Sequence, residues 1–123
     1  MTQPLALVFY EKLLPGSQLV NRLQDLNYRV QTINDLTVLL QSAQTEGPML
    51  VVVDLASQRG DVCNVIATLK ADATTQHIPI IAFAGEQATA LLAAAQKAGA
   101  TLAVGEATIV NYLPQLLNQA LQV

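Results

Sequence analysis

The chain has 123 residues and a mass of 13.1 kDa, and we expect one domain over residues 1–123. Hydrophobic residues make up 52% of it and the mean hydropathy is +0.39, which excludes a disordered chain. A net charge of −3, with 6 Lys and Arg residues, argues against nucleic-acid binding. The single cysteine, Cys63, excludes an internal disulfide framework. Because no apolar run is long enough to span a membrane, we expect a soluble cytoplasmic protein without membrane contact.

Short apolar runs alternate with helical patterns along the chain. The apolar runs are rich in β-branched residues and lack polar alternation, which is typical of parallel strands covered on both faces. The helical segments repeat apolar residues at helix spacing, so that each has one apolar stripe. In chain order, the predicted elements are strand 5–9, helix 17–26, strand 29–32, helix 35–45, strand 49–54, helix 61–71, strand 79–83, helix 87–98, strand 102–104 and helix 108–122.

Capping and turn residues mark the ends of several predicted helices. Ser17, after a Pro-Gly pair, is the expected N-cap of the first helix, and Gly47 should end the second. Gly99 stands where a helix C′ glycine belongs, directly after the fourth helix. Pro114 lies near the start of the last helix, where a proline is tolerated.

Five successive strand–helix units favour an α/β fold. Because crossovers between parallel strands are right-handed, the expected solution is a flavodoxin-like, doubly wound five-stranded parallel sheet of order 2-1-3-4-5, with five helices on its two faces. Ligands of such sheets bind outside the carboxyl ends of the strands, near the point where the strand order reverses. The residues expected at those ends are Tyr10, Glu11, Asp54, Ala84, Gly105 and Glu106.

Four segments recur in the order and spacing of one family: LQDLNYRVQTIND at 23–35, MLVVVDL at 49–55, LKADATTQHIPIIAFAG at 69–85 and KAGA at 97–100. Together they resemble the receiver domain of two-component response regulators, the CheY-like domains. The resemblance covers the whole chain. It implies a CheY-like fold, a role in signal transduction, and partner contacts on the face formed by the fourth helix, the fifth strand and the fifth helix.

The resemblance implies a phosphoacceptor at the end of the third strand, and this position holds Asp54. Receivers also place two adjacent acids after the first strand to hold Mg²⁺. Here Glu11 matches one acid and Tyr10 stands at the other, so Glu11 and Asp54 remain as metal-ligand candidates, which Glu106 could join. Tyr10 either fills the vacated site with its ring or hydrogen-bonds one of these acids. Asp54 is either a phosphoacceptor or, as we favour, a carboxylate that closes the strand end by accepting backbone hydrogen bonds.

Other features of a receiver site are missing. The position of the hydroxyl residue holds Ala84, and the aromatic position of the fifth strand holds Ala103. The lysine position falls on Glu106, or on Gly105 if the loop shifts by one residue. An aspartyl phosphate needs its charge neutralised by a metal and a cation, and a glutamate adds repulsion instead. The chain therefore resembles a degenerate receiver, or pseudo-receiver, with a vestigial acidic pocket.

Three functions compete, and we favour a stand-alone pseudo-receiver that acts by protein–protein interaction. The alternative is a response regulator that a histidine kinase still phosphorylates at Asp54. A small enzyme or ligand binder on the same fold is disfavoured, because the sequence has no glycine-rich phosphate loop, no G-x-S-x-G and no Cys/His pair near a strand end. We therefore expect no catalysis and no cofactor apart from the Mg²⁺ considered above.

Low charge marks the last third of the chain as a contact surface. Between residues 87 and 123 the only charged side chains are Lys97 and Glu106, and depletion of charge is typical of an interface core. This pattern favours a homodimer or a protein partner at the fourth helix, the fifth strand and the fifth helix. The alternative is a monomer whose glutamines keep this face hydrated. The interface candidates are Leu91, Ala94, Ala103 and Tyr112.

Overall fold

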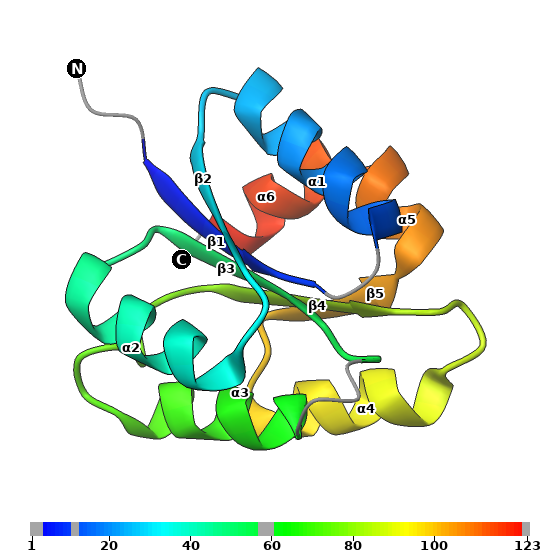
Figure 1. The fold of residues 1–123 in the computed structure, drawn as a ribbon. Helices are drawn as coiled ribbons and strands as arrows, with labels where there is room; N and C mark the ends of the chain where they lie inside the picture. Colours follow the sequence, from blue (N-terminus) through cyan, green and yellow to red (C-terminus); the bar gives the residue numbers. More distant parts are fainter. Residues whose placement is uncertain (1–3, 11–12, 57–60, 122–123) are drawn as a thin grey trace.

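A parallel β-sheet between two layers of helices forms the fold (Figure 1). The computed structural model describes residues 4–10, 13–56 and 61–121. In chain order its elements are β1 (Leu5–Phe9), α1 (Leu13–Asp25), β2 (Arg29–Ile33), α2 (Leu36–Glu46), β3 (Leu50–Asp54), α3 (Val62–Ala71), β4 (Ile80–Ala84), α4 (Thr89–Ala98), β5 (Leu102–Gly105), α5 (Glu106–Asn111) and α6 (Leu113–Leu121). None of the helices in the described ranges is both long and apolar enough to cross a membrane.

The strands are parallel and lie in the order β2-β1-β3-β4-β5, which confirms the predicted flavodoxin-like topology. Figure 1 shows α1, α5 and α6 on one face of the sheet and α2, α3 and α4 on the other. The register pairs Phe9 with Val53 and Ala84 with Gly105, so the carboxyl ends of the strands lie together. Each connection from a strand to the following helix therefore leaves from this same end of the sheet.

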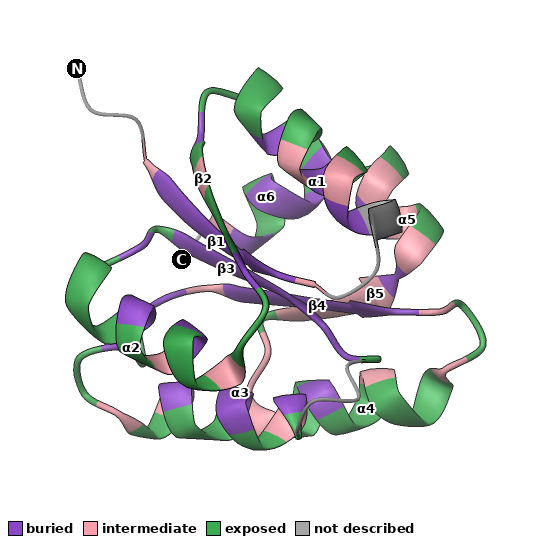
Figure 2. Ribbon diagram, viewed as in Figure 1, coloured by how far each residue is buried: buried purple, intermediate pink, exposed green. Residues whose placement is uncertain are grey.

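The three central strands are buried on both faces (Figure 2). Every residue of β1, β3 and β4 is buried, as expected for strands without polar alternation. Successive side chains point to opposite faces and so supply two separate cores. Leu7, for example, packs in the core that includes residues of α2 and α3, and Val8 packs in the core that includes residues of α1, α5 and α6. A shift by one residue would exchange the two cores, so this double burial specifies the register.

Helix α1 begins earlier than predicted. Ser17 was the expected N-cap, but the structure begins α1 at Leu13 and places Ser17 inside the helix. Pro15 is then in the first turn. Proline is tolerated there because the first N–H groups of a helix have no partner within the helix.

The last predicted helix, 108–122, is wrong as a single element. The described chain instead forms α5 and α6, which makes six helices in place of the five expected. Tyr112 separates them with φ −122° and ψ 27°. Pro114 explains the break, because it has no N–H to donate to the preceding turn and its ring clashes with the carbonyl four residues earlier. It is accommodated as the second residue of α6.

The ends of the other helices carry recognisable caps. The side chains of Asp35 and Asp61 accept hydrogen bonds from backbone N–H groups in the first turns of α2 and α3. Gly47 and Gly99 follow α2 and α4 with φ 60° and 119°, the left-handed conformation that favours glycine. The predicted helix ends at these two glycines are confirmed.

Candidate functional site

Asp54 ends β3 at the carboxyl end of the sheet. The residue is 2% exposed, and its Oδ1 accepts a hydrogen bond from the Ala56 N–H at 2.9 Å. Asp54 thus accepts a backbone hydrogen bond just beyond the strand end, a contact that is compatible both with a structural carboxylate and with a phosphoacceptor. On the neighbouring strand β4, Phe83 pairs with Asp54 and Ala84 follows it, so Ala84 lies at the same end.

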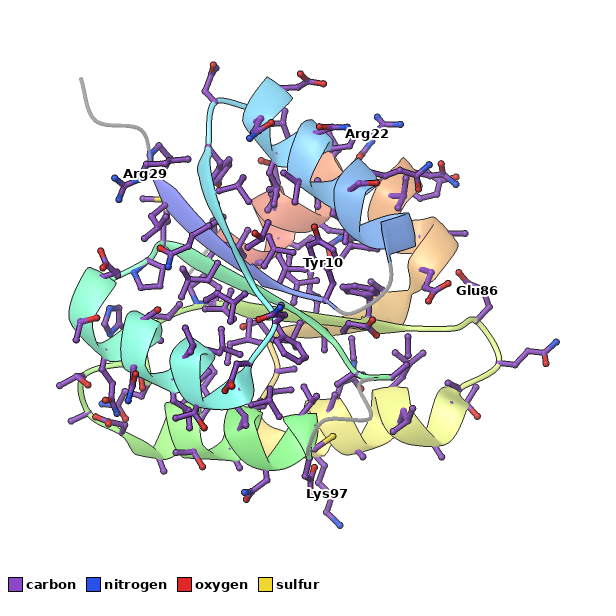
Figure 3. All side chains as sticks on the ribbon, in the orientation of Figure 1. Tyr10, Arg22, Arg29, Glu86 and Lys97 are labelled. Atoms are coloured by element: carbon purple, nitrogen blue, oxygen red, sulfur yellow. The ribbon has the colours of Figure 1, made fainter. Side chains whose placement is uncertain are left out.

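Tyr10 directly follows β1, whose neighbour in the sheet is β3. Its ring is half-buried and packs on the core beneath α1 and α5 (Figure 3). The ring lies so close to Gly16 in α1 that a Cβ at that position would overlap it. Tyr10 therefore fills the space between the end of β1 and the first turns of α1. The predicted Mg²⁺ ligand next to it, Glu11, lies outside the described residues.

The ends of β4 and β5 carry neither a hydroxyl nor an ammonium group. Ala84 is fully buried and pairs with Gly105. Glu106 is half-buried and begins α5. A methyl group thus stands where the receiver resemblance implies a hydroxyl. Either alignment of the loop leaves the lysine position with a glycine or a glutamate.

The described cations lie away from this site. Arg29 begins β2, at the amino end of the sheet, and Arg22 and Lys97 lie in the last turns of α1 and α4 (Figure 3). Lys70 lies in the last turn of α3. Because these helices run back toward the amino end of the sheet, no cation in the described ranges lies at the carboxyl end. The charges that the described residues place there are carboxylates.

Glu86 belongs to this site, although its sequence context does not reveal it. Figure 3 shows its side chain extending from the β4–α4 connection toward α5. The Glu86 Oε1 accepts a hydrogen bond from the Ala107 N–H at 2.9 Å, and the carboxylate lies where a Cβ on Gly105 would stand. Because Gly105 has no side chain, it leaves room for the Glu86 carboxylate. Glu86 therefore caps α5, whose own N-cap residue, Gly105, has no capping side chain. An acid thus lies beside the position for which the resemblance implies a lysine.

The described residues form no metal centre of three or more His, Cys, Asp and Glu side chains. The predicted pair Glu11 and Asp54 is not placed, because only Asp54 lies within the described ranges. Cys63 is half-buried on α3, where burial and then the charge of Asp61 raise the pKa of its thiol. A raised pKa disfavours the thiolate, so Cys63 is not an activated nucleophile.

The interface candidates lie around β5, an edge strand of the sheet. Leu91, which is 39% exposed, and Ala94 lie on the outer surface of α4. Tyr112, between α5 and α6, is 56% exposed, and Ala103 on β5 is half-buried. Both α4 and α5 contact β5 from opposite faces of the sheet, so the candidates share one side of the molecule (Figure 1).

Removal of the Glu86 carboxylate is expected to free the Ala107 amide. In Glu86→Ala, hydrogen exchange at Ala107, followed by NMR, should accelerate roughly fivefold, the effect of losing an ordinary helix cap. Gly105→Ala should accelerate it equally, because the new methyl group displaces the same carboxylate. Combining Glu86→Ala with Gly105→Ala should not accelerate exchange at Ala107 beyond either single variant. Gln87→Ala, at the neighbouring exposed residue, is the control. Unchanged exchange in Gly105→Ala would contradict this placement of Glu86.

No protein-family model and no curated protein sequence matches the chain, but solved structures do. The chemotaxis response regulator CheY4 of Vibrio cholerae is 18% identical, with a TM-score of 0.83 over 97% of this chain and 99% of that one. A putative response regulator from Chloroflexus aurantiacus is 16% identical, with a TM-score of 0.89 over 98% of each chain. The receiver domain of a histidine kinase from Syntrophus aciditrophicus is 14% identical, with a TM-score of 0.83 over 96% of this chain and 89% of that one.

These identities are low, so the likeness concerns the fold. The matches extend over nearly the whole chain. They agree with the observed strand order and with the helices on both faces of the sheet. The chain has the CheY-like, flavodoxin-like fold of response regulator receiver domains.

Proposed function

We propose that this chain is a pseudo-receiver, a cytoplasmic signalling domain that acts through protein–protein contact and not through a phosphoryl switch. One observation carries the proposal: the carboxylate of Glu86 lies next to Gly105. The resemblance implies a lysine at Gly105 or at the following residue, Glu106. The domain needs no cofactor for this role and catalyses no reaction.

The electrostatics of the site oppose an added phosphoryl group. Two unit charges of like sign about 4 Å apart repel by roughly 4 kcal/mol at an effective dielectric of about 20. A phosphoryl group on Asp54 would add negative charge to an end of the sheet that already carries Glu86 and Glu106. Ala84 has no hydroxyl to donate to it, and the described cations lie elsewhere. The described ends of β4 and β5 therefore supply neither the hydroxyl nor the ammonium group that would stabilise an aspartyl phosphate.

A phosphorylated response regulator is the second candidate, and Asp54 itself favours it. The carboxylate stands at the carboxyl end of β3, at the position that the resemblance assigns to the phosphoacceptor. The resemblance implies a histidine kinase as the source of the phosphoryl group. The two candidates differ in one measurable property, the covalent modification of Asp54.

The surface around β5 supports a role in protein contact. Leu91 and Tyr112 are large exposed apolar side chains on opposite sides of this edge strand. Lys97 points away from the body of the molecule (Figure 3), and Glu106 is half-buried. Little charge therefore has to be desolvated when another protein covers this surface. Because closed twofold pairing is the commonest form of self-association, we propose a homodimer, with a different protein partner as the alternative occupant.

Phosphodonor treatment is expected to leave the mass of the protein unchanged. The reason is that the described ends of β4 and β5 supply the carboxylates of Glu86 and Glu106 but no ammonium group or hydroxyl. Intact-mass spectrometry after incubation with acetyl phosphate and Mg²⁺ provides the measurement, with Asp54→Asn as the control. A stable gain of one phosphoryl group that Asp54→Asn abolishes would instead establish the response-regulator alternative.

The surface around β5 should hold two copies of the chain together. Light scattering at micromolar concentration is expected to give twice the mass of the 13.1 kDa chain. Ala94→Arg should halve that mass, because it places an unpaired charge on the exposed side of α4. Ala67→Arg makes the same change on the exposed side of α3 and should leave the dimer intact. A monomeric wild type that also captures no protein from a lysate would refute the interaction role.

A further inference from the structure

A second candidate site lies at the amino end of the sheet, opposite Asp54. A half-open cavity of about 630 Å³ is bounded by the connections that lead into β3, β4 and β5 and by the end of α6. This volume falls in the range of small-molecule sites. None of its lining residues belongs to the carboxyl-end site, so the cavity has no part in the function proposed above.

Lys70 supplies a fixed cation to this cavity. Its Nζ donates to the Ile78 carbonyl at 2.9 Å and to the Gln76 carbonyl at 3.2 Å. Its aliphatic stem packs against Gly99, where a Cβ would be 2.8 Å from the Lys70 Cγ. An ammonium group has three donors, so two backbone bonds hold it in place and leave one donor for a ligand.

No carboxylate in the described residues accepts from the Lys70 ammonium. Burial lowers the pKa of Lys70, as expected for an ammonium that is partly removed from water. An anionic ligand would compensate this desolvation. Lys70 is therefore a positioned cation whose charge the described chain does not neutralise.

The other polar side chains of the cavity can also donate. The Thr101 Oγ1 accepts from the Ile80 N–H at 3.0 Å, which leaves its hydroxyl hydrogen available to a ligand. His77 is exposed and contributes an imidazole to the lining. Among the described residues, the lining includes no Asp or Glu. The polar character of the cavity is therefore complementary to an anion.

The rest of the lining is mostly apolar, including Pro48, Met49 and Leu121. Met49 is 49% exposed, so it adds apolar surface to the lining of the cavity. An unbranched hydrocarbon segment would cover this surface and remove it from water. The Lys70 cation and the apolar lining together favour a ligand that has both an anionic group and an apolar body.

We propose that this cavity binds a small amphipathic carboxylate, with its carboxylate on the Lys70 ammonium and its apolar body along Met49 and Leu121. Such a ligand gains a charge-assisted hydrogen bond at one end and hydrophobic burial at the other. The same cavity should discriminate against a neutral molecule with an identical apolar body.

Octanoate is the probe for this site, followed by NMR on the whole chain. We expect saturable shifts at the amides of Gly47, Gly99 and Thr101, and an affinity at least tenfold higher for octanoate than for octan-1-ol, the order expected of one charge-assisted hydrogen bond. Lys70→Met should lower octanoate affinity by about the same factor, because methionine keeps the apolar stem and removes the charge. Lys97→Met, on α4 outside the cavity, should have no effect.

Met49→Glu gives an independent test that does not disturb Lys70. Met49 is exposed, so the fold should persist, and the new carboxylate should repel octanoate from the cavity. Asp54→Asn should leave octanoate binding unchanged, which separates this site from the carboxyl end. Equal affinity for octanoate and octan-1-ol, shifts scattered over the surface, or octanoate affinity that survives both Lys70→Met and Met49→Glu would overturn the proposal.

Discussion

The pairing of three fully buried parallel strands determines where the functional side chains of this protein lie. Because β1, β3 and β4 expose no residue, a slip in their register would carry side chains from one core into the other. Asp54 and Ala84 are therefore held at one end of the sheet. The cavity around Lys70 lies at the other end, where the loops enter the same strands. Two chemically different surfaces thus depend on one set of strand contacts.

At the carboxyl end of the sheet, two carboxylates make structural contacts with the backbone. Asp54 remains at the strand end, but one of its oxygens serves the backbone of the following turn. Glu86 caps α5 across the space next to Gly105, a contact that a side chain at 105 would obstruct. The Glu86 carboxylate thus has a structural role, since it stabilises the start of α5.

The fold could be predicted from the sequence because its strongest signal is local. Unbroken apolar runs identified β1, β3 and β4, and alternation with helices then left few topologies. The break at Tyr112 was missed because the start of the last helix was misplaced: Pro114 lies in the interior of a helix that begins at residue 108, but in the first turn of one that begins at Leu113. Glu86 was missed for a different reason: its partner, Ala107, lies 21 residues away, and no local pattern records such a contact. The donors of the Lys70 cavity likewise come from separate segments that only the folded chain brings together.

Binding of a phosphoryl analogue tests the central claim most directly, because it bypasses the need for a cognate kinase. Beryllium fluoride with Mg²⁺ can be titrated into the protein while NMR follows the amides of Ala56, next to the Asp54 carboxylate, and of Ala107, which Glu86 caps. Because Ala84 and Gly105 supply neither a hydroxyl nor an ammonium group at the described ends of β4 and β5, the pseudo-receiver proposal predicts no saturable shift at either amide. Stoichiometric, saturable shifts at both amides, lost in Asp54→Asn, would show a working phosphoryl site and contradict the pseudo-receiver function.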